Sequence, residues 1–436
     1  MPVKYIDVTA KSDLFVPATR AFGDIAIVGK GVGASGASGP HEFTDPASPI
    51  AAYLTRSVAD AVIKSGSTTV TSAANGFATS DVGRAVTGTG ILSGTTIVKV
   101  TNAGSVELSA ASTGAGTGVA LSGLPGEHSD LGDAIAMAFR QSPPPTRVWG
   151  VQVDATTPDW DTALTAVAKL DVQIVALANT PLNSSTAQTV DKLATHVSTV
   201  SNTGGDGKER IGVAMLDSSL TASAQAALNT GTVANERMFL IAHRSSEDVA
   251  AAAAGVIAGV QPHISVLLKP ININQDPSRG FSDSEIDTLD SAFINWVTSP
   301  VLIPGSGVYL GEGYTANPGQ GNKKYIDVVR TLDDINFRVK AELIQAMGNL
   351  RVSRSGLRAI ETLVEAVLSP LMAQAVIEDY SVFIRLLVLL SKDPASLSAA
   401  ELQEIQDAQA SRKIDMAINV TYAGAIHRLH IDLVFK

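Results

Sequence analysis

Apolar and polar positions between residues 147 and 260 follow two alternating periods. Short runs of Val, Ile, Leu and Ala are each followed by a stretch whose apolar positions recur every three or four residues. The runs predict strands at 147–154, 172–179, 210–217 and 237–243, and the stretches predict helices at 159–170, 186–200, 221–228 and 246–260. Strands that alternate with helices of this length indicate parallel β-α-β units with helices packed on a sheet.

Residues 56–126 follow a different pattern. Short β-branched runs such as TTV, TTIVKV and SVELS are separated by Gly and Asn, and charged residues are scarce. This pattern predicts a small all-β module. A flexible linker is the alternative for a Gly/Thr-rich tract, but linkers do not alternate Val and Ile with polar residues in this way.

The part of the chain after the α/β segment passes from loops to helices. Residues 264–325 are rich in loops, with one helix expected near 283–297. Apolar positions then recur at helical spacing over 324–347 and again over 354–377. Pro370 is expected to end or kink the second of these helices, because proline removes a backbone donor and clashes with the preceding turn.

The last residues, 414–436, contain two alternating runs. Each run places apolar side chains at every second position, which is the period of a strand. We therefore expect a pair of strands that meet at a turn near Ala423 and Gly424.

Composition narrows the classes of function. The chain has 436 residues, 45% of them hydrophobic and 17% charged, which is typical of a globular protein with several domains. Its net charge of −10 argues against a generic nucleic-acid binder, which needs a basic surface to displace counterions from phosphate. The absence of cysteine excludes disulfides, thiolate metal sites and cysteine nucleophiles.

The strongest apolar runs in the chain are 249–260 and 382–390. Both are shorter than the roughly 20 residues that a membrane-spanning helix needs. The first residues also lack the continuous apolar core of a signal peptide. We expect a chain that is made in the cytoplasm and does not insert directly into a membrane.

Gly31, Gly33 and Gly36 follow the apolar run IAIV and spell G-x-G-x-x-G, the phosphate-binding turn of dinucleotide-binding proteins. That motif requires a helix that begins within it, because the helix N-terminus holds the pyrophosphate. Here three prolines follow within 40–49, and the next helix is expected only near 48–52. We expect the glycines to let the chain turn into an α/β body. The alternative is a nucleotide-binding α/β enzyme that uses this turn.

The sequence assigns no catalytic residue, cofactor or metal ligand. His427 and His430 are three apart on a predicted strand and point to opposite faces, so they cannot share a metal ion. Asp333 and Asp334 are expected to be solvated on a helix, and the acidic residues at 283–290 fit a helix cap. No nucleophile elbow or Walker phosphate loop is present. We therefore expect a protein that is not an enzyme.

Basic residues gather between positions 338 and 358, where Glu342 is the single acidic residue. The basic residues are Arg338, Lys340, Arg351, Arg354 and Arg358. One interpretation is that arginine near a helix C-terminus is favoured by the helix dipole. The other is a contact with an acidic partner, in which complementary charge sets the register.

The order of these pieces resembles the sheath proteins of contractile phage tails and related contractile injection systems. FGDIAIVGKG and EFTDPASPIAAYL look like the opening strand, Gly-rich turn and loop of this family. LGDAIAMAFRQSPPPTRVWGVQV, the AAAAGVIAGV helix and the KPININ loop are similar to its α/β core. The most specific similarity is in KKYIDVVRTLDDINFRVKAELI and the closing YAGAIHRLHIDLVF, although the family's adjacent pair of arginines is reduced to Arg330.

The resemblance implies an α/β multidomain fold of the α+β type, with helices packed on a mixed sheet. The implied parts are an N-terminal arm (1–24), an α/β body (25–55 plus 127–325), an all-β surface insertion (56–126) and a C-terminal sheath domain (326–436). The C-terminal domain is expected to carry a terminal strand that is exchanged between subunits.

The function implied by the resemblance is structural. The subunit would polymerise as a helical array around an inner tail tube and contract by rigid-body rearrangement, driving the tube through a target envelope. Terminal strands would pair with the sheets of neighbouring subunits, and the basic segment would face the tube. The expected exchange residues are Tyr5, Ile6, Val8, Leu429, Ile431, Leu433 and Phe435, and the expected tube-facing residues are Arg351, Arg354 and Arg358.

The partners implied by the resemblance are other copies of the chain, the tube protein, the baseplate and the tail terminator. Neither a cofactor nor a nucleic acid is implied. The expected location is a virion tail or an injection particle assembled in the cytoplasm of the producing cell. A surface-array or adhesin protein is a third alternative, which draws on the Gly/Thr-rich module.

Overall fold

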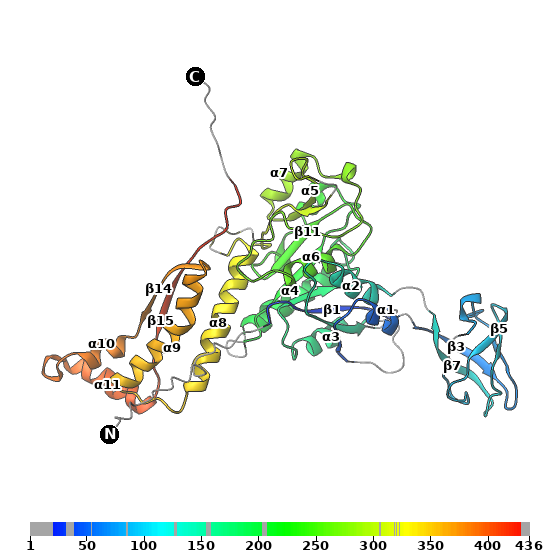
Figure 1. Ribbon diagram of the computed structural model, residues 1–436, viewed down its shortest axis with the longest axis horizontal. Coiled ribbons are helices and arrows are strands. Elements are labelled where there is room, and N and C mark those ends of the chain that lie inside the picture. Colours follow the sequence, from blue (N-terminus) through cyan, green and yellow to red (C-terminus); the bar gives the residue numbers. More distant parts are fainter. Residues whose placement is uncertain are drawn as a thin grey trace, which may run out of the picture. The chain divides into compact units, whose positions relative to one another are not determined.

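The structure is a computed structural model that describes residues 21–31, 39–53, 55–83, 86–125, 129–153, 158–202, 207–304, 307–317, 319, 321 and 323–428. Contacts divide the chain into two compact units, and many of their elements are labelled in Figure 1. The body comprises Phe22–Ile326, and the C-terminal unit comprises Met1–Ala21 with Asp327–Lys436.

The body is built on an eight-stranded sheet. Its parallel strands run in the order β8-β1-β9-β10-β11-β12, so the chain reverses direction across the sheet once, beside β1. A short antiparallel strand closes each edge, β2 beside β8 and β13 beside β12. The strands are β1 Asp24–Lys30, β2 His41–Phe43, β8 Arg147–Val153, β9 Ile174–Leu177, β10 Ile211–Met215, β11 Met238–Ala242, β12 Asn295–Thr298 and β13 Tyr309–Leu310.

Helices cover both faces of this sheet, as parallel strands with almost continuous apolar runs require. On one face, α2 (Asp130–Phe139) and α6 (Val249–Ala258) contact β1 and each other, and α1 (Ala47–Tyr53) packs on α2. The small residues of α6 permit this contact, because a Cβ at Gly255 would clash with the carbonyl oxygen of Ala138.

The other face of the sheet carries the larger apolar core. There α3 (Trp160–Val167) and α4 (Ala187–Asn202) pack on the strands and on each other, and α5 (Ala222–Ala226) contacts α7 (Asp283–Ser291). Each of α3, α5 and α6 begins at an Asp or Thr cap whose side chain accepts a backbone N–H of the first turn. The predicted succession of strands and helices is therefore observed along 147–260.

Residues 55–125 form a separate five-stranded antiparallel sheet with the order β5-β6-β4-β3-β7. Its core is apolar and consists of residues of its own strands and loops, among them Val70, Ile97 and Leu121, none of which is exposed. A linker would have no such core. The strands are β3 Thr55–Ile63, β4 Thr69–Ser72, β5 Ile97–Asn102, β6 Ser105–Leu108 and β7 Gly116–Pro125, with a short 3-10 helix η2 at Thr79–Asp81.

The C-terminal unit contains a helical hairpin, a two-stranded sheet and a second helical pair. The long helices α8 and α9 pack through Ile335, Val364 and Leu368 against β14 and β15. The shorter α10 and α11 share a second core around Leu387 and Ile405. The elements are α8 Ile326–Ala346, α9 Arg354–Ala373, β14 Ile377–Phe383, α10 Arg385–Ser391, a short 3-10 helix η5 Pro394–Ser396, α11 Ala399–Ser411 and β15 Ala417–Tyr422. Two further short 3-10 helices, η3 Gly231–Val233 and η4 Pro277–Arg279, belong to the body.

Two sequence predictions are corrected by the structure. Of the pair of strands expected within 414–436, the first is observed as β15, which pairs with β14; residues 423–428 form no strand, and the rest of the second run lies outside the described residues. The helix expected over 283–297 ends at Ser291, because Phe293 adopts a positive φ of 57° and the chain then enters β12. The second long helix ends at Ala373, so Pro370 lies in its last turn and Ile377 already belongs to a strand.

Candidate interaction surfaces

The two-stranded sheet of the C-terminal unit has open edges. β14 and β15 are antiparallel, and their register runs from Ile377 opposite Tyr422 to Phe383 opposite Ala417. Within the described residues no third strand pairs with either of them. Among the described residues, the outward edges of both strands therefore carry no further strand, and a two-stranded sheet is only marginally stable by itself.

The end of β15 is anchored to the first turn of α8. The hydroxyl of Tyr422 donates to Oδ2 of Asp327 at 2.8 Å, and Asp327 is only 3% exposed. The hydroxyl of Thr331 donates to the carbonyl oxygen of Asp327 at 2.7 Å. Burial and the Asp327 carboxylate raise the pKa of Tyr422, so it stays protonated and keeps donating. This contact fixes the point at which the chain leaves the sheet toward its C-terminus.

The same helix buries more charge than the sequence indicates. Asp333, expected to be solvated, is 6% exposed, and Arg330 is equally buried. Burial lowers the pKa of Arg330 to about 10, an effect that the carboxylates of Asp327, Asp334 and Asp333 oppose. Asp334 forms an ion pair with Arg338 at 2.8 Å. The expectation for Asp333 was wrong because helical periodicity alone does not show which polar face is covered.

The basic segment lies at the start of a helix. Arg351, Arg354 and Arg358 are exposed, and α9 begins at Arg354 behind the cap Ser353. The N-terminus of a helix carries the positive end of its dipole, so the interpretation based on a favourable helix C-terminus is wrong for Arg354 and Arg358. Arg358 pairs with Glu361 at 2.6 Å, and Arg351 reaches the carbonyl oxygen of Gly348 at 3.4 Å.

The Gly-rich turn begins at the carboxyl end of β1. Gly31 donates its N–H to the carbonyl oxygen of Val153 and accepts a hydrogen bond from Nε2 of Gln152 at 2.6 Å. Gly33 and Gly36 lie outside the described residues. From residue 39 onward the chain forms β2 and reaches its first helix only at Ala47. The described residues that follow the turn therefore offer no helix N-terminus to a pyrophosphate.

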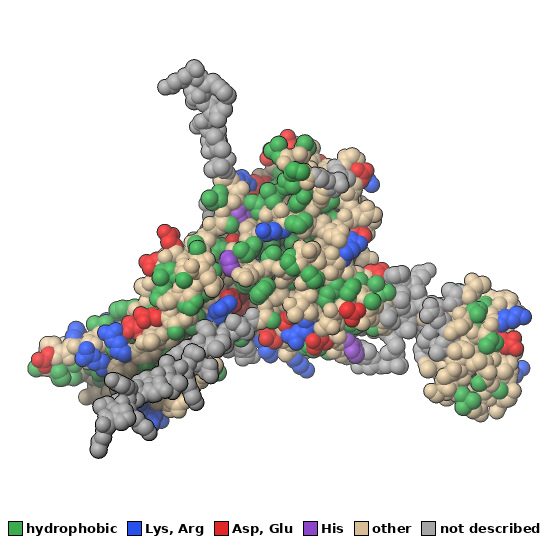
Figure 2. All heavy atoms as spheres, in the orientation of Figure 1, with side chains coloured by type: hydrophobic (Ala, Val, Ile, Leu, Met, Phe, Trp, Pro, Cys, Tyr) green, Lys and Arg blue, Asp and Glu red, His purple; other side chains and the backbone are tan. Residues whose placement is uncertain are grey.

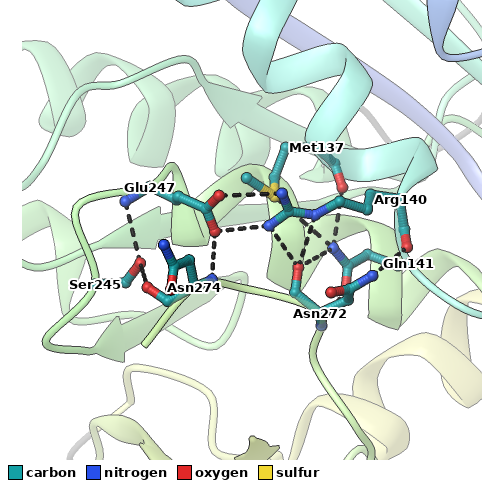
Figure 3. A network of polar contacts seen from close by, with 7 residues as sticks. All are labelled: Met137, Arg140, Gln141, Ser245, Glu247, Asn272 and Asn274. Carbon is teal, nitrogen blue, oxygen red and sulfur yellow. Dashed lines mark hydrogen bonds and ion pairs between the residues drawn. The ribbon is translucent and has the colours of Figure 1, made fainter. Parts of the chain in front are cut away.

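A polar network joins α2 to the segment before α6 (Figure 3). Arg140 donates to the carboxylate of Glu247 at 3.0 and 2.6 Å and to the carbonyl oxygen of Asn272 at 3.1 and 2.8 Å. Gln141 accepts the backbone N–H of Asn272 at 2.7 Å and donates to the carbonyl oxygen of Met137. The charge of Arg140 is therefore matched within the body, and its side chain holds the loop at Asn272 in place.

A hollow of about 380 Å³ lies beside this network, near the carboxyl ends of β9 and β11. Doubly wound folds bind anionic cofactors at such a position. Here the lining includes four carboxylates, those of Asp130, Asp133, Glu247 and Asp248, which would repel a phosphate. In the part of the chain that the structure describes, no group of three His, Asp or Glu side chains could hold a metal ion.

Two histidines are buried in the body. His196 is 9% exposed, and burial together with Arg210 lowers its pKa to about 4. His243 is 3% exposed, and burial lowers its pKa to about 4 as well, although Asp217 opposes this effect. Both are therefore neutral at physiological pH and belong to the core.

On the face drawn in Figure 2, Lys and Arg side chains are scattered singly and in small groups among Asp and Glu. Among the described residues, no helix is both long and apolar enough to cross a membrane.

The sequence matches no protein-family model and no curated protein. Solved structures, however, match along the whole chain. The contracted helical sheath of the anti-feeding prophage is 12% identical, with a TM-score of 0.59 over 100% of this chain and 98% of that one. The chain has the fold of contractile sheath proteins.

Two other structures agree with this assignment of the fold. A chain of the six-fold symmetrised anti-feeding prophage baseplate has a TM-score of 0.55 at 12% identity, over 100% of this chain and 99% of that one. The sheath tail protein from Desulfitobacterium hafniense has a TM-score of 0.52 at 12% identity, over 88% and 93%. The predicted fold class and the resemblance to sheath proteins are confirmed at the level of the fold.

The structure describes only some of the predicted interaction residues. Arg351, Arg354 and Arg358 are described and lie together at the start of α9. The expected exchange residues Tyr5, Ile6, Val8, Leu429, Ile431, Leu433 and Phe435 lie outside the described residues. Sequence reasoning missed β14, for which the only signal was the alternation in IEDYSVF. It also missed the contact between Tyr422 and Asp327, for which the sequence offers no signal.

The hydrogen bond between Tyr422 and Asp327 predicts that the hydroxyl of Tyr422 contributes more to stability than that of Tyr380, which lies in the same sheet. Tyr422→Phe should lower the free energy of unfolding by about 1–3 kcal/mol, because the carboxylate of Asp327 stays buried after losing a donor. Tyr380→Phe is the control, since its hydroxyl meets Ser369 at an exposed site, and it should change stability by less than about 0.5 kcal/mol. Urea unfolding of both variants measures this. Equal losses in the free energy of unfolding of the two variants would contradict the stabilising role of the Tyr422–Asp327 hydrogen bond.

The buried histidines predict acid sensitivity. A free histidine titrates near pH 6.5, whereas these two bind a proton in the folded body only near pH 4. Below pH 6.5 the unfolded chain therefore binds protons that the folded chain does not. The free energy of unfolding should fall between pH 6.5 and 4, by up to about 3 kcal/mol for each histidine.

Replacing His196 and His243 by glutamine removes these titrating groups. Urea unfolding at several pH values in this window should then give a shallower dependence on pH than the unmodified chain shows, whatever the change in absolute stability. An unchanged slope would show that other groups cause the acid sensitivity.

Proposed function

We propose that this chain is the structural subunit of a contractile sheath, which polymerises as a helical array around an inner tube and contracts by rigid-body rearrangement. The observation that carries the proposal is the similarity of fold along the whole chain, including a structure described as a helical sheath in a contracted state. The baseplate structure supports association with a baseplate at one end of the array. A location in a phage tail or injection particle follows from the same proposal.

The open edges of β14 and β15 support a joint made by strand exchange. Strand addition obtains most of its affinity from main-chain hydrogen bonds, so it tolerates changes of angle between the bodies that it connects. β15 ends at Tyr422, and the alternating segment that holds Leu429, Ile431, Leu433 and Phe435 begins seven residues later. In the proposal this segment, and the one around Tyr5, Ile6 and Val8, pair with sheets of neighbouring subunits.

Contacts of this kind are heterologous, because one patch of a subunit meets a different patch of its neighbour. Such contacts produce open helical arrays when the rotation between neighbours does not close a ring. The proposal therefore requires no cofactor and no nucleotide hydrolysis. The nucleotide-binding alternative has no supporting feature among the described residues, so an enzymatic function is not proposed.

The start of α9 supports a contact with an acidic partner. Positive charge at a helix N-terminus costs roughly 0.3–1 kcal/mol per residue in the isolated chain. A partner with carboxylates on its surface would offset this cost and set the register between the two proteins. In the proposal Arg351, Arg354 and Arg358 face the inner tube.

Strand exchange can be tested with two substitutions in the last segment. In a strand, Leu433 and Val434 point to opposite faces, so only one of them lies on the apolar face shared with Leu429 and Ile431. Leu433→Asp should abolish helical polymers in electron micrographs, whereas Val434→Asp should leave them largely intact. Polymers that survive both changes, or deletion of residues 429–436, would rule out this joint.

The basic segment can be tested with a triple replacement. Changing Arg351, Arg354 and Arg358 to glutamine should weaken co-sedimentation of the sheath protein with the inner tube and reduce the dependence of binding on salt. It should also leave the chain as stable as before or more stable, since an unfavourable interaction with the helix dipole is removed. Arg412→Gln, at an exposed site after α11, is the control. If the triple variant bound the inner tube as the unmodified chain does, the start of α9 would be excluded as the tube-binding face.

A further inference from the structure

The last residues of the body hold a lysine inside a group of aromatic rings. The ammonium of Lys324 lies 5.3 Å from the ring centre of Phe293, 4.8 Å from that of Tyr314 and 5.4 Å from that of Tyr325. A cation within about 6 Å of an aromatic face is attracted by the ring quadrupole. Lys324 is half-buried and forms no ion pair within the described part of the chain. The rings are therefore its principal electrostatic partners there.

The rings themselves are held rigidly. Tyr314 is 1% exposed, stacks on Tyr325 with centroids 5.4 Å apart, and contacts Phe293 at 5.6 Å. Its hydroxyl donates to Oδ1 of Asp290 at 2.8 Å. The side chain of Asn295, on β12, accepts the N–H of Tyr314 at 2.6 Å and donates to its carbonyl oxygen at 2.9 Å. The central ring is thereby attached to the main sheet of the body.

The main chain around Lys324 is tied to the same strip. The N–H of Thr315 donates to the carbonyl oxygen of Lys324 at 2.9 Å, and the N–H of Ile326 donates to that of Gly313 at 2.9 Å. The hydroxyl of Thr315 donates to the carbonyl oxygen of Lys323 at 2.8 Å. Because α8 begins at Ile326, these contacts hold the first residue of that helix against the body.

We propose that Lys324 is a positioning residue that acts as a latch: its contact with the three rings holds the first residue of α8, the root of that helix, against the body. α8 continues from Ile326 into the C-terminal unit, which carries the open sheet edges. If the start of α8 is held firmly, movement passes along the helix as along a rigid rod. If it is loose, local opening of 313–317 and 323–326 absorbs the movement. The part of this inference that concerns contraction rests on the proposed sheath function, and the part that concerns the latch does not.

Two neighbouring lysines provide a matched test. Lys324→Gln keeps a side chain of similar length but removes the charge from the rings, while Lys324→Arg keeps the cation–π interaction. Lys323→Gln removes an equal charge one residue away, where the lysine pairs with Glu236 at a partly exposed site. Hydrogen exchange of the full-length chain reports the opening of this strip.

In Lys324→Gln, the amides of Thr315 and Ile326 should exchange about tenfold faster, a factor within the range of a partly desolvated cation–π interaction. The amides of Val213 and Leu240, in the centre of the sheet, should exchange as before. Lys324→Arg and Lys323→Gln should resemble the unmodified chain. Equal exchange in all variants would overturn the latch, and so would faster exchange of Val213 and Leu240, which would indicate general destabilisation.

The second measurement uses assembled sheaths. Extended sheaths of Lys324→Gln should contract at a lower urea concentration than those of Lys323→Gln, because the loosened root lowers the barrier to rearrangement. Contraction at the same concentration would overturn the role in contraction. If the unmodified chain formed no polymers, the sheath function itself would fail, and hydrogen exchange would still decide whether Lys324 is a latch.

Discussion

Backbone hydrogen-bonding capacity at the edges of sheets is the constraint on which this structure depends. Every strand has two edges, and an edge without a partner exposes a row of donors and acceptors. In the large sheet of the body this problem is contained, because β2 and β13 close its edges and have only three and two residues. Edges this short give a foreign strand little to pair with. Longer edge strands occur in the five-stranded sheet, where β5 has six residues and β7 ten, and in the C-terminal unit, where β14 has seven and β15 six.

Helices α8 and α9 cover one face of that small sheet, so its register is set although its edges are open. The apolar side chains that pack against β14 and β15 include those of Val364, Leu368 and Leu371. The contact between Tyr422 and Asp327 then fixes where β15 ends. A strand from another subunit would therefore meet a template with a defined register and a buried face. A template of this kind favours one pairing over slipped ones.

Charge is arranged differently in the two units. In the body, Arg140 and Arg210 are matched by a carboxylate or by backbone carbonyl oxygens and serve the fold. In the C-terminal unit, Arg330 is buried among carboxylates, whereas Arg351 and Arg354 are exposed at the unfavourable end of a helix. Local stability explains the buried arginines and does not explain the position of Arg351 and Arg354. In the proposed sheath an acidic partner would supply a favourable interaction for them, even though the chain as a whole is acidic.

The sequence predicted best what depends on local pattern. Strands β9, β10 and β11 are continuous apolar runs, and their local signals agree with their place in the centre of the sheet. β14 was missed because IEDYSVF alternates only weakly and its partner strand begins more than thirty residues later. The burial of Asp333 and the ring group around Lys324 were missed for the same reason. Each depends on segments that come together only in the folded chain.

The proposed sheath needs two opposite mechanical properties, which the proposal gives to different interactions. A joint that survives contraction has to tolerate rotation, and main-chain pairing at a sheet edge does so because it does not depend on a single side-chain geometry. The segment that carries the joint has to remain stiff, or the rotation of one subunit would not reach the next. Side-chain contacts would supply this stiffness near the start of α8: the rings around Lys324 lie just before the helix, and the hydroxyl of Tyr422, the last residue of β15, donates to Asp327 in its first turn. In the proposed sheath, compliance would therefore lie in the backbone bonds between subunits, and rigidity in the side chains within each subunit.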